Sequence, residues 1–162
     1  MVDREVKIAA LSLVSLLAIV AIVYPTISAY DNSAFAFSEF AVLGPGQSLA
    51  GYPRLLVTGQ PFLLYAYIEN HEGNAEYYQV LVKLGNQSTS ISNSTAANAP
   101  VIFKNAAVLL DNQSLEFPMY LSISNIGLNQ RLIFELWTYN MAKSGFSYTG
   151  IWNQIWINVT LP

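Results

Sequence analysis

Apolar and polar residues alternate along the stretch Phe62–Leu84, which predicts the centre of the fold. Two runs rich in aromatic and β-branched residues flank a polar break at Asn70–Asn74. The side chains expected on one buried face are Phe62, Leu64, Ala66 and Ile68 in the first run, and Tyr78, Val80, Val82 and Leu84 in the second. Alternation with a period of two on both sides of a short, Gly-containing loop predicts a β-hairpin, whereas an amphipathic helix needs a period of 3.6.

Further apolar runs separated by turn residues predict more strands after residue 31. These runs are Phe35–Leu43, Val101–Leu110, Ser114–Ile123, Arg131–Tyr139 and Ile151–Leu161. Pro118 places one of them at a sheet edge, because proline cannot donate to a strand ladder. The Ser/Thr/Asn-rich segment Gly85–Pro100 predicts an exposed loop, and Gly145 and Gly150 mark a flexible loop before the last strand. About seven strands and no convincing soluble helix predict an all-β, antiparallel immunoglobulin-like β-sandwich.

An uncharged apolar run before these strands predicts one transmembrane helix. Ile8–Tyr24 contains no charged residue, and its apolar character continues to Ala29. About 20 apolar residues span the hydrocarbon core of a bilayer. Arg4 and Lys7 precede the run and no Lys or Arg follows it until Arg54, so the positive-inside rule places the N-terminus in the cytosol.

The predicted organisation is therefore a single-pass membrane protein. Residues 1–30 form a short cytosolic tail and the helix, and residues 31–162 form an extracytosolic domain. A cleaved signal peptide is the alternative, with Ile27-Ser28-Ala29 as a loose cleavage site. The apolar run is longer than the usual core of a signal peptide, which favours an uncleaved anchor in contact with membrane lipid.

The composition is poor in charge, since 53% of residues are apolar, 13% are aromatic and only 10% are charged. A typical globular domain has about 25% charged residues. Attached glycans, burial in a larger assembly, or an acidic medium would each account for so uncharged a surface. The net charge of −3 argues against nucleic acid as a partner, and the absence of cysteine excludes disulfides and thiol chemistry.

No residue pattern predicts catalysis, a cofactor or a metal. His71 is the single histidine, and the carboxylates near it, Glu69, Glu72 and Glu76, lack the spacing of a known metal loop. A structural turn is the simpler prediction, with Asn70 capping its own backbone and Gly73 taking a positive φ. Three more carboxylates lie within apolar strands, where the outward, solvent-facing side is expected for them: Glu39, Glu116 and Glu135. We expect no enzyme.

Four Asn-x-Ser/Thr sequons are candidate glycosylation sites. They begin at Asn86, Asn93, Asn112 and Asn158. Three of the four fall in predicted loops on the extracytosolic side, where a glycosyltransferase can reach them. Glycans there would help to keep a weakly charged domain in solution.

Aromatic residues predict a partner-binding face. In the last two strands and in Ala75–Leu84, the side chains that alternate with the expected core point to the other side. The aromatic ones are Tyr77, Trp137, Tyr139, Trp152 and Trp156. These three strands share one sheet in an immunoglobulin-like sandwich, so the outer face of that sheet is expected to display all five rings.

Several short motifs occur in a fixed order along the chain: Phe37-Ser38-Glu39-Phe40, Leu43-Gly44-Pro45, Gly51-Tyr52-Pro53, Ile68-Glu69-Asn70-His71-Glu72, Arg131-Leu132-Ile133-Phe134-Glu135-Leu136 and Trp156-Ile157-Asn158-Val159. In combination they resemble an archaeal membrane-protein family catalogued only as a domain of unknown function. The resemblance covers about 125 residues and implies an archaeal envelope protein whose domain is similar to adhesion-type immunoglobulin-like modules. Members usually carry several membrane helices before this domain, whereas one is predicted here.

Three functions fit these observations. The first is a non-enzymatic accessory or structural subunit, anchored by its helix, whose sandwich contacts a larger membrane or surface-layer complex. The second is a cell-surface glycan-binding or adhesion module, with Gln79, Asn153 and Gln154 as polar partners of the aromatic rings. The third is a secreted filament subunit with strand donation between neighbours, which requires a cleaved anchor.

Overall fold

The computed structural model describes residues 13–21 and 36–162. The chain divides into two compact units, Met1–Ala36 and Phe37–Pro162. Residues 13–21 are helical. Across the described ranges, no helix combines the length and the apolar character that a membrane span requires. Most of the predicted anchor, Ile8–Tyr24 and its extension to Ala29, lies outside the described residues.

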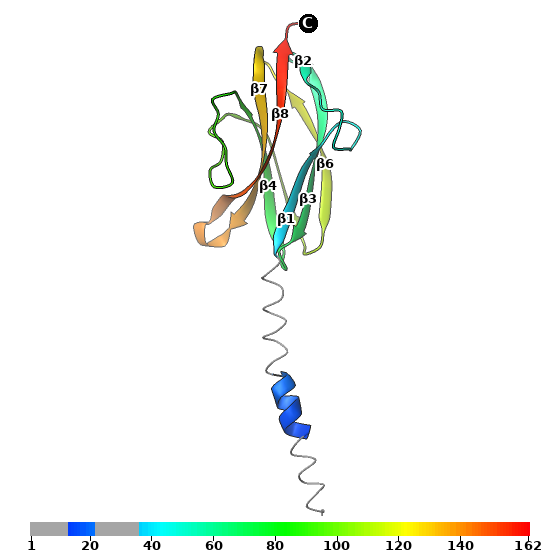
Figure 1. The fold of residues 1–162 in the computed structure, drawn as a ribbon, viewed down its shortest axis with the longest axis vertical. Coiled ribbons are helices and arrows are strands. Elements are labelled where there is room, and N and C mark those ends of the chain that lie inside the picture. Colours follow the sequence, from blue (N-terminus) through cyan, green and yellow to red (C-terminus); the bar gives the residue numbers. More distant parts are fainter. Residues whose placement is uncertain (1–12, 22–35) are drawn as a thin grey trace, which may run out of the picture. The chain divides into compact units, whose positions relative to one another are not determined.

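Eight strands form two sheets in the second unit (Figure 1). The smaller sheet has the order β1-β3-β6, with β1 Phe37–Leu43, β3 Pro61–His71 and β6 Ser114–Ser122. The larger sheet has the order β2-β8-β7-β4-β5, with β2 Leu55–Val57, β8 Gly145–Thr160, β7 Gly127–Asn140, β4 Glu76–Gly85 and β5 Val101–Leu109. Every neighbouring pair is antiparallel except β2 and β8, which are parallel.

This topology is immunoglobulin-like. In that fold the first, second and fifth strands share one sheet, and the third, sixth and seventh share the other. Here β1, β3 and β6 occupy the first set, and β4, β7 and β8 occupy the second, with β5 added at the edge. The predicted β-sandwich is confirmed, but it has eight strands. The additional strand is β2, whose three residues are too few to show alternation.

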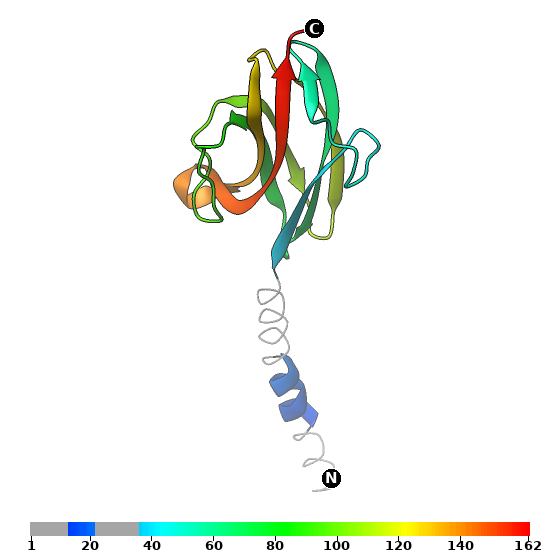
Figure 2. The ribbon, with the colours of Figure 1, turned by 45° about the horizontal axis from the view of Figure 1, so that its top comes forward.

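The predicted hairpin over Phe62–Leu84 is wrong. β3 pairs with β1 and β6, whereas β4 pairs with β5 and β7, so the connection after His71 crosses from one sheet to the other (Figure 2). The alternation itself is confirmed, because Leu64, Ala66 and Ile68 face the core from one side. Alternation decides which face of a strand is buried, but it does not decide which strand lies beside it.

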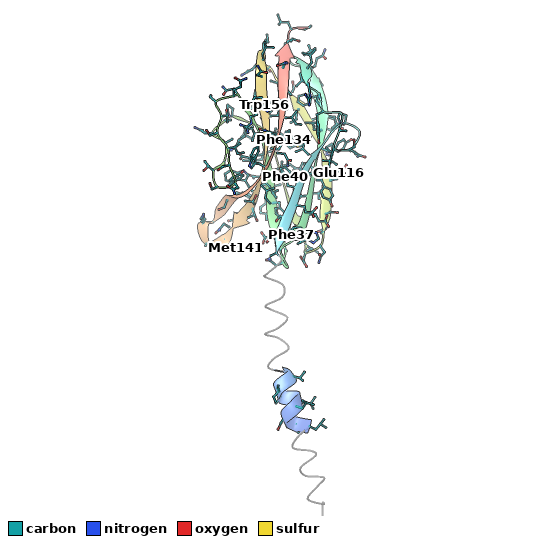
Figure 3. All side chains as sticks on the ribbon, in the orientation of Figure 1. Phe37, Phe40, Glu116, Phe134, Met141 and Trp156 are labelled. Atoms are coloured by element: carbon teal, nitrogen blue, oxygen red, sulfur yellow. The ribbon has the colours of Figure 1, made fainter. Side chains whose placement is uncertain are left out.

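The core lies between the two sheets and is built from the inward side chains of both. The central strand β7 contributes Leu132, Phe134 and Leu136, none of which is exposed to solvent. Figure 3 shows Phe134 in the middle of this layer. β6 is an edge strand, as Pro118 predicts, and its proline is exposed.

The predicted flexible loop around Gly145 and Gly150 is also wrong. β7 and β8 continue as a long pair that ends in a 3-10 turn at Met141–Lys143. The ladder is interrupted near Gly150, whose φ is +86°. A Cβ at this position would lie 2.3 Å from the carbonyl oxygen of Asn93, so Gly150 reflects a close approach of backbones inside a strand rather than a loop.

Candidate interaction surface

The structure places all five predicted interface residues on the outer face of the larger sheet. Tyr77 belongs to β4, Trp137 and Tyr139 belong to β7, and Trp152 and Trp156 belong to β8. Their exposure differs, since Tyr77 and Trp156 are 42% and 41% exposed while the other three are half-buried. Their contacts divide them into three groups.

The first group is an apolar row across four adjacent strands. Val108 pairs with Tyr77, and Tyr139 pairs with Phe146. The Phe146 ring lies 5.0 Å from that of Tyr77 and 5.5 Å from that of Tyr139, between centroids. Within the described part of the chain, neither tyrosine hydroxyl has a hydrogen-bond partner. We call Val108, Tyr77, Tyr139 and Phe146 the aromatic row. Its three rings pack against one another, while the hydroxyl groups of Tyr77 and Tyr139 stay free.

The second group is a stack around Arg131. The Arg131 guanidinium carbon lies 5.5 Å from the ring centroid of Trp152 and 5.5 Å from that of Trp156. Its Nε donates to Gln154, and its Nη1 donates to the carbonyl oxygen of Thr89 at 2.8 Å. Cation–π contacts of this kind hold the two indoles in place, so part of their ring surface is engaged within the chain.

The third group lies beneath the β4–β5 connection, which folds back over the sheet. The Glu135 carboxylate accepts hydrogen bonds from the backbone N–H of Ala97 at 2.6 Å and from Trp137 Nε1 at 2.9 Å. Lys83 Nζ lies 2.8 Å from the same carboxylate and donates to the carbonyl oxygen of Ala97 at 2.8 Å. Trp137 itself is only half-buried, but its Nε1–H is already engaged within its own chain.

This arrangement corrects the prediction that Glu135 faces solvent. Its side chain points to the outer face, as the alternation predicts, yet it is fully buried. A central strand normally exposes its outer face, but here the loop that contains Ala97 covers it. Glu39 and Glu116 do lie exposed on β1 and β6, where β3 separates them.

His71 is the last residue of β3, and the predicted structural turn follows it directly. Asn70 is buried, and its Oδ1 accepts from the backbone N–H of Glu72 at 2.9 Å, while Gly73 has a φ of +77°. His71 Nδ1 lies 2.9 Å from Oδ1 of Asn112. The described residues contain no group of three His, Cys, Asp or Glu side chains arranged to hold a metal ion.

The hydrogen bond to Asn112 raises the pKa of His71 above its ordinary value of about 6.5, and the nearby Glu69 carboxylate adds to this rise. Protonated His71 therefore stabilises the fold below the ordinary pKa, and this contribution disappears as the pH rises through the raised pKa.

A pH titration of the imidazole signals by NMR tests this shift, because the chain has one histidine. We expect a midpoint above about 6.5 that moves down in Asn112→Ala. Asn129→Ala is the matched control, since Asn129 also has a positive φ but lies near the start of β7, in another part of the fold. A midpoint that Asn112→Ala leaves unchanged would contradict the assignment.

The four sequons differ in their surroundings. Asn86, Asn93 and Asn112 lie exposed outside the strands, as predicted, whereas Asn158 lies within β8. Asn158 Oδ1 accepts from the backbone N–H of Asn129, and Asn112 is bonded to His71 and Asp111. Asn86, Asn93 and Asn112 are thus exposed while Asn158 is half-buried, and glycosylation at any of the four stays a prediction.

Three residues of this surface escaped the sequence analysis. Phe146 was assigned to a loop, and extending the alternation of β8 to Gly145 would have found it. Val108 has an outward position on β5, but the predicted face comprised only aromatic residues and so did not include it. Arg131 gave no signal, because its place between two indoles depends on cross-strand register.

Comparison with solved structures finds distant similarity to several proteins. A beta-glucosidase from Listeria innocua aligns with a TM-score of 0.47 and 11% identity over 77% of this chain, which spans only 16% of the glucosidase chain. The sporulation control protein Spo0M from Bacillus subtilis aligns with a TM-score of 0.44 and 6% identity. The alignment covers 77% of this chain and 50% of the Spo0M chain. A PapD-like domain of human CEP192 aligns with a TM-score of 0.42 and 7% identity. The alignment covers 77% of this chain and 86% of the CEP192 domain. Similarity at this level carries no information about function.

Comparison with curated proteins finds no match. A family model described as a domain of unknown function, DUF1616, matches residues 32–154. This range contains β1 to β7 and most of β8, and thus both sheets of the sandwich. The chain belongs to the DUF1616 family, and its member domain here is a β-rich, immunoglobulin-like sandwich.

Proposed function

We propose that this chain is a non-enzymatic accessory or structural subunit of a larger membrane or cell-envelope complex. Its N-terminal segment anchors it to the membrane, and its sandwich contacts a protein partner outside the cytosol. The aromatic row, in which Tyr77 and Val108 are exposed and Tyr139 and Phe146 are half-buried, carries this proposal. Four neighbouring strands contribute one side chain each to the row. One of the four, Val108, lies on the edge strand β5 and is 60% exposed.

The chemistry of the row fits a protein interface. Tyrosine rings with free hydroxyls suit a surface that is apolar over most of its area and polar at its rim. Met141, which Figure 3 labels, lies between β7 and β8 close to Tyr139 in the chain and is 84% exposed. Only 10% of the residues in the chain are charged, and so low a charge also favours a surface that is buried in an assembly.

The anchor and its orientation rest on the sequence. Ile8–Tyr24 is long enough to cross a bilayer, and Arg4 and Lys7 before it favour a cytosolic N-terminus. The resemblance of the motifs from Phe37 onward to an archaeal membrane-protein family supports an archaeal envelope setting.

Substitution of the row tests the proposal. In Tyr77→Ser and Phe146→Ser, we expect loss of the partner during copurification of the full-length chain from mild detergent at native expression. Truncation of a buried aromatic anchor commonly costs about 2 kcal/mol, or roughly 30-fold in affinity. The thermal unfolding midpoint of Tyr77→Ser should stay close to wild type, since Tyr77 is substantially exposed.

Tyr120→Ser is the matched control, because Tyr120 is 71% exposed on β6 of the opposite sheet. It should leave copurification unchanged. A wild-type chain that elutes alone from its native membrane, or a Tyr77→Ser chain that keeps its partner in full, would count decisively against this function.

A further inference from the structure

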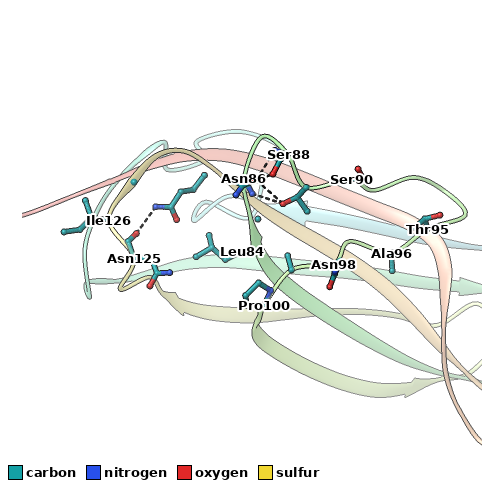
Figure 4. A pocket seen from close by; sticks show the side chains of 15 residues that line it. Leu84, Asn86, Ser88, Ser90, Thr95, Ala96, Asn98, Pro100, Asn125 and Ile126 are labelled. Carbon is teal, nitrogen blue, oxygen red and sulfur yellow. Dashed lines mark hydrogen bonds between the residues drawn. The ribbon is translucent and has the colours of Figure 1, made fainter.

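The largest cavity described lies away from the aromatic row, beneath the β4–β5 connection. It has a volume of about 680 Å³. The connection forms one side and the turn between β6 and β7 forms the other, with Leu84 between them (Figure 4). Leu84 lies seven residues beyond Tyr77 on β4, which is roughly 23 Å along a strand. This cleft and the aromatic row are therefore separate surfaces.

The lining of the cleft is neutral throughout. It consists of amide, hydroxyl and small apolar side chains, and no Asp, Glu, Lys, Arg or His contributes to it. A charged ligand bound there would lose hydration without gaining an opposite charge, which is unfavourable. The cleft therefore selects for an uncharged ligand.

Several polar side chains of the cleft have no partner within the described residues. The amides of Asn98 and Asn125 and the hydroxyls of Ser90 and Thr95 make no hydrogen bond to another described residue. An amide offers donors and an acceptor side by side, which matches the neighbouring hydroxyls of a sugar ring. Leu84 and Ile126 supply apolar surface for the C–H faces of such a ring.

Hydrogen bonds within the chain hold both sides of the cleft in place. Leu84 N–H donates to the carbonyl oxygen of Pro100 at 2.9 Å and closes the base of the connection. Asn86 Oδ1 accepts from the N–H of Ser88 at 2.9 Å and fixes the first turn of that connection. Gln130 Nε2 donates to the carbonyl oxygen of Asn125 at 2.8 Å. A site that is already ordered loses less entropy when a ligand binds.

We infer that this cleft is a binding site for a short, uncharged oligosaccharide. Its volume lies within the range of about 300–1,000 Å³ that small-ligand sites occupy. Asn98 and Asn125 bind the sugar hydroxyls from opposite sides, and Ile126 contacts the ring. This inference goes beyond the proposed contact with a protein partner and does not depend on it, because the cleft and the aromatic row share no residue.

Binding is tested with the full-length chain in an amine-oxide detergent, since maltoside head groups would compete. The probes are maltotriose, cellotriose and mannotriose, with trigalacturonate as a charged counterpart, and binding is followed by amide chemical shifts in NMR. We expect at least one neutral trisaccharide to bind with a dissociation constant of about 1 mM or below, and trigalacturonate to bind at least about tenfold more weakly.

Asn98→Ala and Asn125→Ala should each weaken this binding about tenfold or more, with the chemical shifts of the remaining fold unchanged. Asn105→Ala on β5, outside the cleft, is the matched control and should bind as wild type does. The inference is overturned if no neutral trisaccharide binds at about 10 mM, if trigalacturonate binds as well as they do, or if both cleft variants bind normally. Copurification of the protein partner is not expected to change in either cleft variant, so the two proposals fail separately.

Discussion

Glu135→Leu is expected to lower the free energy of unfolding by about 3–5 kcal/mol, because it leaves the Lys83 ammonium buried without its counter-ion. The Glu135 side chain is completely buried, and that of Lys83 is only 8% exposed. The same carboxylate also holds the N–H of Ala97 and Nε1 of Trp137. Removing it therefore detaches the connection between β4 and β5 from the sheet as well as breaking the ion pair.

Urea unfolding of the full-length chain, followed by tryptophan fluorescence, measures this loss. Lys83→Met combined with Glu135→Leu should recover a large part of it, since no unpaired charge remains buried. Glu116→Leu, at an exposed position of β6, is the control and should change stability by less than about 0.5 kcal/mol. Hydrogen exchange at Ala97 should quicken in the single variant. A Glu135→Leu chain as stable as wild type would mean that the connection does not lie over Glu135.

Phe134→Ala is expected to cost about 3–5 kcal/mol of stability through the cavity that it leaves. Phe134 has no exposed surface and lies on β7, between β4 and β8 at the centre of the larger sheet. Its neighbours belong to regular strands and are unable to collapse fully into the vacated space. The same urea titration measures the change.

Tyr77→Ser provides the contrast, because a substantially exposed side chain on the outer face should lose little stability on truncation. The pair of variants thus separates core from surface within one sheet. If Tyr77→Ser were as destabilising as Phe134→Ala, the tyrosine would belong to the core and the aromatic row would not be a free surface.

Local sequence determined much about this domain. Alternation identified the buried faces of β3 and β4, since successive side chains of a strand point to opposite sides. Pro118 identified an edge strand, because it lacks the N–H that a central strand must donate. Asn70 and Gly73 identified the turn after β3, because their conformational preferences act within a few residues. Each of these features depends on interactions between near neighbours in the chain.

Only the tertiary structure decided which strands lie side by side and which outward residues are covered. β3 and β4 have the alternation of a hairpin but belong to different sheets, because pairing depends on segments as distant as β1 and β7. Glu135 has an outward position but is buried under a loop, whose contact with it at Ala97 is 38 residues away in the chain. Arg131 lies between two indoles because of the register between β7 and β8. Such contacts form only when remote segments meet, so no local pattern of residues encodes them.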